Sequence, residues 1–115
     1  SGKLSCWGEN RARQCGTGTQ SGTRTTRVPP QGISAARSIG CGDTFVCAGV
    51  NASLMCWGSN EFGQLGERST TDRPTPVPGP SIDAASVAGG AGHACAVDRG
   101  GAVWCWGDNR SGQVG

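Results

Sequence analysis

The segment Trp57-Gly-Ser-Asn-Glu-Phe-Gly-Gln-Leu-Gly66 is one of three similar copies in this 115-residue chain, and this repetition indicates the fold. Equivalent ten-residue segments begin at Trp7 and at Trp106, so successive tryptophans are 50 and 49 residues apart. A repeat of roughly 50 residues indicates one supersecondary unit copied in tandem, which needs its neighbours to bury its apolar faces. Residues shared by all copies are therefore expected to be structural. Residues with a specific function are expected where one copy departs from the others.

The composition narrows the class of protein. The chain has 21 glycines, no tyrosine and a formal net charge of +2 that comes from scattered arginines, so no basic stripe indicates nucleic-acid binding. The sequence contains no apolar run long enough to cross a membrane. No catalytic constellation is recognisable, and the glycine-rich stretch 89–92 lacks the following Lys-Ser/Thr of a phosphate-binding loop. We therefore expect a protein that is not an enzyme and needs no cofactor.

Short apolar runs bounded by Gly, Asn and Asp predict strands and tight turns, and no segment has a sustained helical period. Four strands of the second repeat are expected at 34–40, 43–50, 53–58 and 74–78. Further strands are expected at 84–89, 92–98 and 102–107, and in the first linker at 25–29. Four short strands per repeat are typical of a β-propeller blade. A parallel solenoid is the weaker alternative, because its repeats are shorter.

The order of these motifs resembles the regulator of chromosome condensation repeat. The tryptophan motif is followed by a Pro-x-x-Val-like stretch, then Val/Ile-x-x-Gly, then His-x-Cys-Ala and a hairpin that returns to Trp-Gly. Members of that family usually form a seven-bladed propeller. The resemblance implies an all-β partial propeller of about two four-stranded blades plus a flanking strand. Its expected organisation is the end of a truncated blade at 1–16, one repeat at 17–66 and another at 67–115.

The first copy of the motif departs from the other two. Arg13 stands where Gly63 and Gly112 stand, and Cys15 stands where the other copies have Leu or Val. If the glycine position has a positive φ, Arg13 is strained or the first loop is reshaped.

Seven cysteines are many for a protein of a reducing compartment. A two-residue hairpin turn places Cys47 opposite Cys56, and a three-residue turn places Cys95 opposite Cys105. If the first pair beyond each turn is hydrogen-bonded, both cysteine pairs occupy non-hydrogen-bonded sites, where Cα atoms are about 4.5 Å apart and a disulfide can form. We expect two disulfides within hairpins, and the alternative is buried free thiols.

Cys15 and Cys41 break the repeat on either side of one linker, so they are predicted to be partners. The strand partner of Cys6 would lie before Ser1, so Cys6 is expected to be unpaired or bonded outside this chain. The chain is accordingly expected to be a piece of a propeller that a longer parent protein or other subunits complete. The single histidine, His93, and the lack of Cys-x-x-Cys argue against a metal site.

Two further sets of residues are candidates for sites. The sequons at Asn51 and Asn109 are possible glycosylation sites, with Asn51 at a hairpin tip and Asn109 expected to have its amide engaged in a turn. Trp104 and Phe62 are possible contact residues, although for Trp104 packing between blades is the favoured interpretation.

The function that these observations favour is a non-catalytic binding or structural module. It would be a segment of a β-propeller (glyco)protein or assembly, located outside the cell or in the secretory pathway, with an unknown protein partner. The resemblance implies a guanine nucleotide exchange factor for a small GTPase as one alternative, although disulfides would not persist in a nuclear protein. A secreted enzyme inhibitor is the other alternative, since some propellers of similar sequence have that role.

Overall fold

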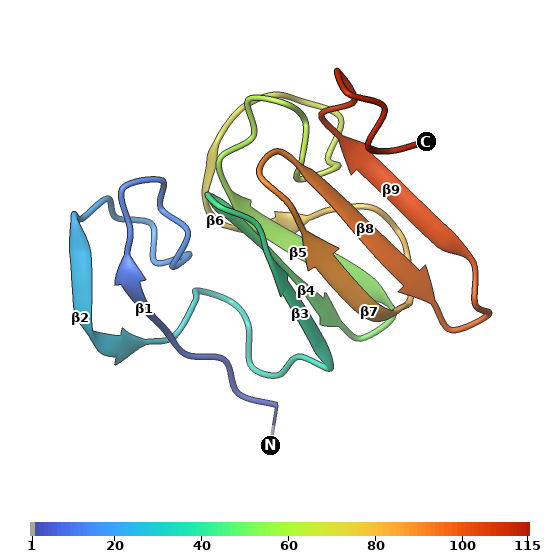
Figure 1. Ribbon diagram of the computed structural model, residues 1–115. Helices are drawn as coiled ribbons and strands as arrows, with labels where there is room; N and C mark the ends of the chain where they lie inside the picture. The colour runs from blue at the N-terminus through green and yellow to red at the C-terminus, as the bar shows by residue number, and fades with distance from the viewer. Residues whose placement is uncertain (1) are drawn as a thin grey trace.

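The computed structural model describes residues 2–115, and in this range the chain forms nine β-strands and no helix. The strands are β1 (Cys6–Glu9), β2 (Thr23–Val28), β3 (Ser38–Cys41), β4 (Phe45–Val50), β5 (Ser53–Gly58), β6 (Arg73–Pro78), β7 (Ala84–Gly89), β8 (His93–Asp98) and β9 (Val103–Gly107). They make three antiparallel sheets, β1-β2, β3-β4-β5-β6 and β7-β8-β9 (Figure 1). The predicted all-β partial propeller is confirmed, and the middle sheet has all four strands of a blade. Within the described range there is accordingly no helix that could span a membrane.

The strand expected at 34–40 is displaced in the structure. It begins at Ser38 and continues to Cys41. Ahead of it, the backbone N–H of Ala36 donates to the carbonyl of Gly2, so this part of the chain belongs to the connection from the first sheet.

The two hairpins have the register that the turn lengths predicted. Val50 pairs with Ser53 and Cys47 with Cys56 across β4 and β5. In β8 and β9, Cys95 faces Cys105. Disulfide bonds join both cysteine pairs, each with a Cα–Cα distance of 4.1 Å.

The pairing expected for the other cysteines is wrong in this structure. Cys15 is bonded to Cys6, with 5.3 Å between their Cα atoms, and not to Cys41. Cys15 occupies the position of Leu65, which is fully buried in the same cluster as Cys56, the equivalent of Cys6. Replacing that leucine by cysteine therefore brings a thiol to Cys6 within one repeat. Cys41 is an exposed free thiol at the end of β3.

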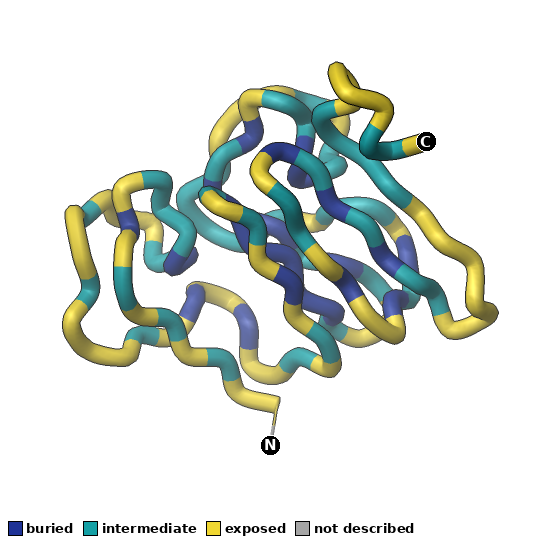
Figure 2. The backbone as a smooth tube through the Cα atoms, in the orientation of Figure 1, coloured by how far each residue is buried: buried dark blue, intermediate teal, exposed yellow. Residues whose placement is uncertain are grey.

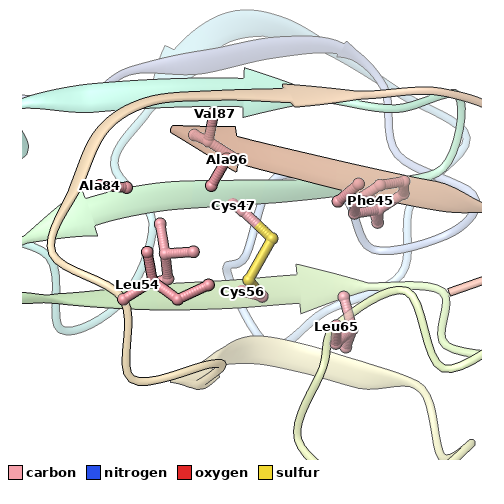
Figure 3. Packing of buried hydrophobic residues seen from close by; sticks show 10 residues of the cluster. Phe45, Cys47, Leu54, Cys56, Leu65, Ala84, Val87 and Ala96 are labelled. Atoms are coloured by element: carbon pink, nitrogen blue, oxygen red, sulfur yellow. A yellow bond between two sulfur atoms is a disulfide. The ribbon is translucent and has the colours of Figure 1, made fainter. Parts of the chain in front are cut away.

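The two central strands of the middle sheet, β4 and β5, are mostly buried, and Figure 2 shows them largely dark. Alternate residues of β4 and β5 face opposite ways, which is the period of a strand. One face packs against the third sheet in a cluster that includes Phe45, Leu54, Val87 and the Cys47–Cys56 bond (Figure 3). The other face carries Trp57 and Val46 toward the first sheet.

Glycines allow the first strands of neighbouring blades to touch. A Cβ on Gly40 of β3 would lie 2.4 Å from the carbonyl oxygen of Val87 in β7. A Cβ on Gly89 of β7 would lie 2.5 Å from the backbone nitrogen of Gly42. Backbone atoms cannot rotate away as side chains do, so the close packing of β3 and β7 requires glycine at both positions.

Candidate functional site

The repeated ten-residue motif forms a loop that its own side chains hold in place. In the second copy, Asn60 Oδ1 accepts the backbone N–H of Leu65 at 3.0 Å, and Gln64 Oε1 accepts that of Phe62 at 2.9 Å. Asn10 and Gln14 make the equivalent bonds in the first copy, and Asn109 and Gln113 make them in the third. The recurring Asn and Gln therefore serve the shape of the loop.

The recurring tryptophan joins one blade to the next. The indole N–H of Trp57 donates to the backbone carbonyl of Gln14 at 2.8 Å, and Trp106 donates to Gln64 at the same distance. Trp57 is 1% exposed, whereas Trp7, which has no such acceptor in the described residues, is 63% exposed. Each bond connects the third strand of one blade to the motif loop of the preceding blade. Among the described residues, the exposed Trp7 and the carbonyl of Gln113 have no such partner.

The departure at Arg13 leaves the loop shape intact. Arg13 has a φ of 62°, close to the 73° of Gly63 and the 75° of Gly112. A side chain is strained in this left-handed region. The structure thus shows a strained arginine in an unchanged loop.

The described residues include three disulfides and one free thiol, and they contain no cluster of His, Cys, Asp and Glu that could hold a metal ion. The free thiol of Cys41 is exposed, but the atoms around it desolvate its thiolate and raise its pKa. A raised pKa keeps the thiol protonated and less nucleophilic at neutral pH.

The two sequon asparagines differ in their surroundings. Asn51 is exposed at the tip of the β4–β5 hairpin, with a φ of 55°. Asn109 is also exposed, and its side-chain oxygen accepts the backbone N–H of Val114. Glycosylation of either residue remains a prediction.

The two candidate contact residues lie in different environments. Phe62 packs on the third blade: its ring would collide with a Cβ on Gly92, and the guanidinium of Arg110 lies 4.5 Å from the ring centroid. Trp104 is 51% exposed. Of these two residues, only Trp104 is exposed.

Trp104 lines a pocket of about 490 Å³ between the second and third blades. The β6–β7 connection forms one wall with Pro80, Ile82 and Asp83, and the β8–β9 hairpin forms the other with Asp98 and Arg99. We call this the rim pocket. Its lining combines apolar side chains with charged ones.

Hydrogen bonds hold the charged side chains of the rim pocket. Asp98 Oδ2 accepts the indole N–H of Trp104 at 2.9 Å, and Asp98 Oδ1 accepts the backbone N–H groups of Gly100 and Ala102. The bonds from Trp104 and then Ala102 hold the pKa of Asp98 below its usual value, so its carboxyl is ionised at neutral pH. Arg99 Nε lies 3.0 Å from Asp83 Oδ1.

The sequence profile of the regulator of chromosome condensation (RCC1) repeat matches residues 53–97 and 84–113, which together are more than half of the chain. This chain belongs to the RCC1 repeat family. The family assignment agrees with the three tryptophan motifs and with the blades that they connect.

Several solved structures superpose on the chain. Human WBSCR16 has a TM-score of 0.86 at 16% identity, and the match covers 100% of this chain and 35% of the WBSCR16 chain. Prp20p of Saccharomyces cerevisiae, the yeast RCC1, has a TM-score of 0.79 at 23% identity. The match covers 97% of this chain and 30% of the Prp20p chain. In its complex with Kap60, the yeast protein has a TM-score of 0.74 at 23% identity, with coverage of 93% and 28%. No curated protein matches the sequence. At these identities the likeness shows the fold, and this RCC1-repeat chain spans about a third of the length of the solved relatives.

Two features of the site are missed when only the sequence is considered. One is the bond from each tryptophan to the loop of the preceding blade, which joins residues 42 and 43 positions apart. The other is the role of Asp98 and Asp83 beside Trp104. A signal for Asp98 does exist in the sequence, because Asp98 ends its strand where Val50 ends the equivalent strand.

Proposed function

We propose that this chain is a non-catalytic binding or structural module of an extracellular RCC1-type propeller. The observation that carries the proposal is the set of three disulfides, one associated with each blade. Such bonds persist in oxidising compartments and are rare where glutathione and thioredoxin keep thiols reduced.

The disulfides have a clear physical use in this fold. The chain has few large apolar residues for its length, and its first sheet has only two strands. Bonds that close loops of nine or ten residues stabilise the fold by about 2.5 kcal/mol each in the chain-entropy account. A small module with a limited core gains most from such cross-links.

We further propose that other blades of a longer parent protein complete the ring. Exposed Trp7 on one side and the uncovered outer face of β9 on the other fit that arrangement, since Val103 of β9 is 69% exposed. This chain covers about a third of each solved relative, so the rest of each relative is long enough to contain the other blades. Completion by further copies of this chain is the alternative form of the same proposal.

The experiment compares the chain produced in the bacterial periplasm with the chain produced in a reducing cytosol and kept in reductant. The periplasmic chain is expected to unfold cooperatively and to lose several kcal/mol of stability when reductant is added. A chain that is equally stable with and without reductant would contradict the extracellular assignment and would favour an intracellular RCC1-type regulator.

A further inference from the structure

The rim pocket arises because the third blade departs from the repeat at two facing positions. Met55 lies opposite Ala48, and Trp104 lies opposite Ala96, so Met55 and Trp104 are equivalent. Val50 and Asp98 are equivalent in the same way, as the last residues of β4 and β8. In the second blade, Val50 and Met55 pack against the buried cluster around Trp57. In the third blade the hydrogen-bonded pair Asp98–Trp104 replaces this apolar pair.

The replacement leaves part of the Trp104 side chain open to solvent. The edge of the Trp104 ring is used, because its N–H donates to Asp98. Half of the side chain nevertheless remains exposed, at 51%. Figure 2 shows the exposed run through the β8–β9 turn into β9. A fourth strand beside β9 would pair in the plane of the sheet, as β6 pairs with β5, whereas side chains project from the face of a sheet. Completion of the blade therefore does not require the ring to be covered.

The charges around the Trp104 ring favour a cationic ligand. Asp83 and Asp98 carry two negative charges and Arg99 carries one positive charge, so the rim pocket has one net negative charge although the whole chain has +2. The face of an indole attracts cations. A hydrogen bond from the indole N–H to a carboxylate adds electron density to the ring and strengthens that attraction. Neutral and anionic ligands gain nothing from this arrangement.

The free acceptor atoms favour a compact cation. Asp98 Oδ1 already accepts two backbone N–H groups, and Asp83 Oδ1 is paired with Arg99. Neither carboxylate therefore offers both of its oxygens to the fork of a guanidinium, which binds best in a bidentate manner. A protonated amine needs only single oxygens, such as the second oxygen of Asp83, together with the indole face.

We propose that the rim pocket binds the ammonium group of a lysine side chain presented by a protein partner. The four-carbon stem of the lysine lies along the apolar wall made by Pro80 and Ile82, and the ammonium lies between the face of Trp104 and the carboxylates. This proposal rests on the proposed function, since it names the kind of partner that the binding module recognises.

The test follows the indole N–H signal of Trp104 by NMR in the oxidised 115-residue chain. The signal is assigned from its loss in Trp104→Met, a variant that restores the residue of the second blade. N-acetyl-lysine methylamide is the probe. N-acetyl-norleucine methylamide is the matched control, because it has the same stem without the charge.

The expected result is a saturable shift of the Trp104 signal with the lysine probe, with an affinity about threefold or more above that for the norleucine control. The lysine affinity should fall in 1 M salt and in Asp83→Asn, which removes the net negative charge. Trp7→Met, at the opposite side of the molecule, should leave the affinity unchanged.

Equal response to both probes, no response to either, or a response to a neutral oligosaccharide alone would overturn the proposal. These outcomes are separate from a failure of the proposed function. The extracellular assignment depends on the redox state of the cysteines, which is measured without a ligand, and the binding test begins with a chain whose disulfides are already formed.

Discussion

The indole nitrogen of Trp57 lies 2.8 Å from the backbone carbonyl oxygen of Gln14, 43 residues earlier in the chain. The same bond joins Trp106 to Gln64. Each blade is thus connected to the loop of the preceding blade by one repeated donor and one repeated backbone acceptor. This contact between repeats holds neighbouring blades together and accounts for the tryptophan in the second and third copies.

Replacing Trp57 by Phe should destabilise the chain by about 2–3 kcal/mol, because it removes the donor of the bond between blades and leaves a gap beside a buried ring. Trp7→Phe is the matched control. Trp7 is 63% exposed, so its change should be within about 0.5 kcal/mol of zero. Urea unfolding of the oxidised chain measures both. Similar losses for the two variants would contradict the role given to the inter-blade bond.

Asn60→Ala should cost about 3 kcal/mol, because Asn60 is fully buried and its removal leaves several backbone groups without a partner. The side-chain nitrogen of Asn60 donates to Glu67 and to the carbonyls of Ser69 and Thr71. The side-chain oxygen accepts the backbone N–H of Leu65. The equivalent Asn109 is exposed and has one such bond, to Val114. Asn109→Ala is therefore expected to cost about 1 kcal/mol or less. The same unfolding measurement ranks the two, and a reversed order would refute the assignment of Asn60 as the anchor of its loop.

Gly40→Ala should destabilise the chain by about 3 kcal/mol or more, because the new Cβ would lie 2.4 Å from the carbonyl oxygen of Val87 and push β3 from β7. Gly22→Ala has open space around its Cβ and is expected to be nearly neutral. Amide hydrogen exchange should show increased exchange in β7 for Gly40→Ala alone. Normal protection in that variant would mean that the two strands are not packed as closely as described.

Arg13→Gly should stabilise the chain by about 0.5–1 kcal/mol, since relief of the left-handed strain exceeds the added entropy of the unfolded chain. The reciprocal change, Gly63→Ala, should cost about 1 kcal/mol. A Cβ at Gly63 has an atom no closer than 3.9 Å, so this loss is conformational and not steric. Thermal unfolding of both variants checks the pair, and a loss of stability in Arg13→Gly would disprove the strain.

The sequence predicts the contacts of this chain well where those contacts are local. Turn length determines the register of a hairpin, so the residues that face Cys47 and Cys95 follow from the number of residues between the strands. The glycine that stands at the position of Arg13 in the other two copies likewise indicates the conformation of the first loop.

The remaining features depend on contacts that the linear sequence does not show. The partner of Cys15 follows from the contact between a loop position and a strand position, which is visible in the second blade as the packing of Leu65 with Cys56. The surroundings of Trp104 depend on how the β6–β7 connection crosses the third blade. Such relationships appear only when neighbouring blades are in place.

Each blade of this structure is cross-linked within itself by one disulfide. Peptide mapping of the chain, alkylated without reduction and then digested, identifies the linked cysteines. We predict Cys6–Cys15, Cys47–Cys56 and Cys95–Cys105 as linked pairs, with the alkyl label on Cys41. Alkylation of all seven cysteines, or a linkage between different blades such as Cys15–Cys41, would contradict it.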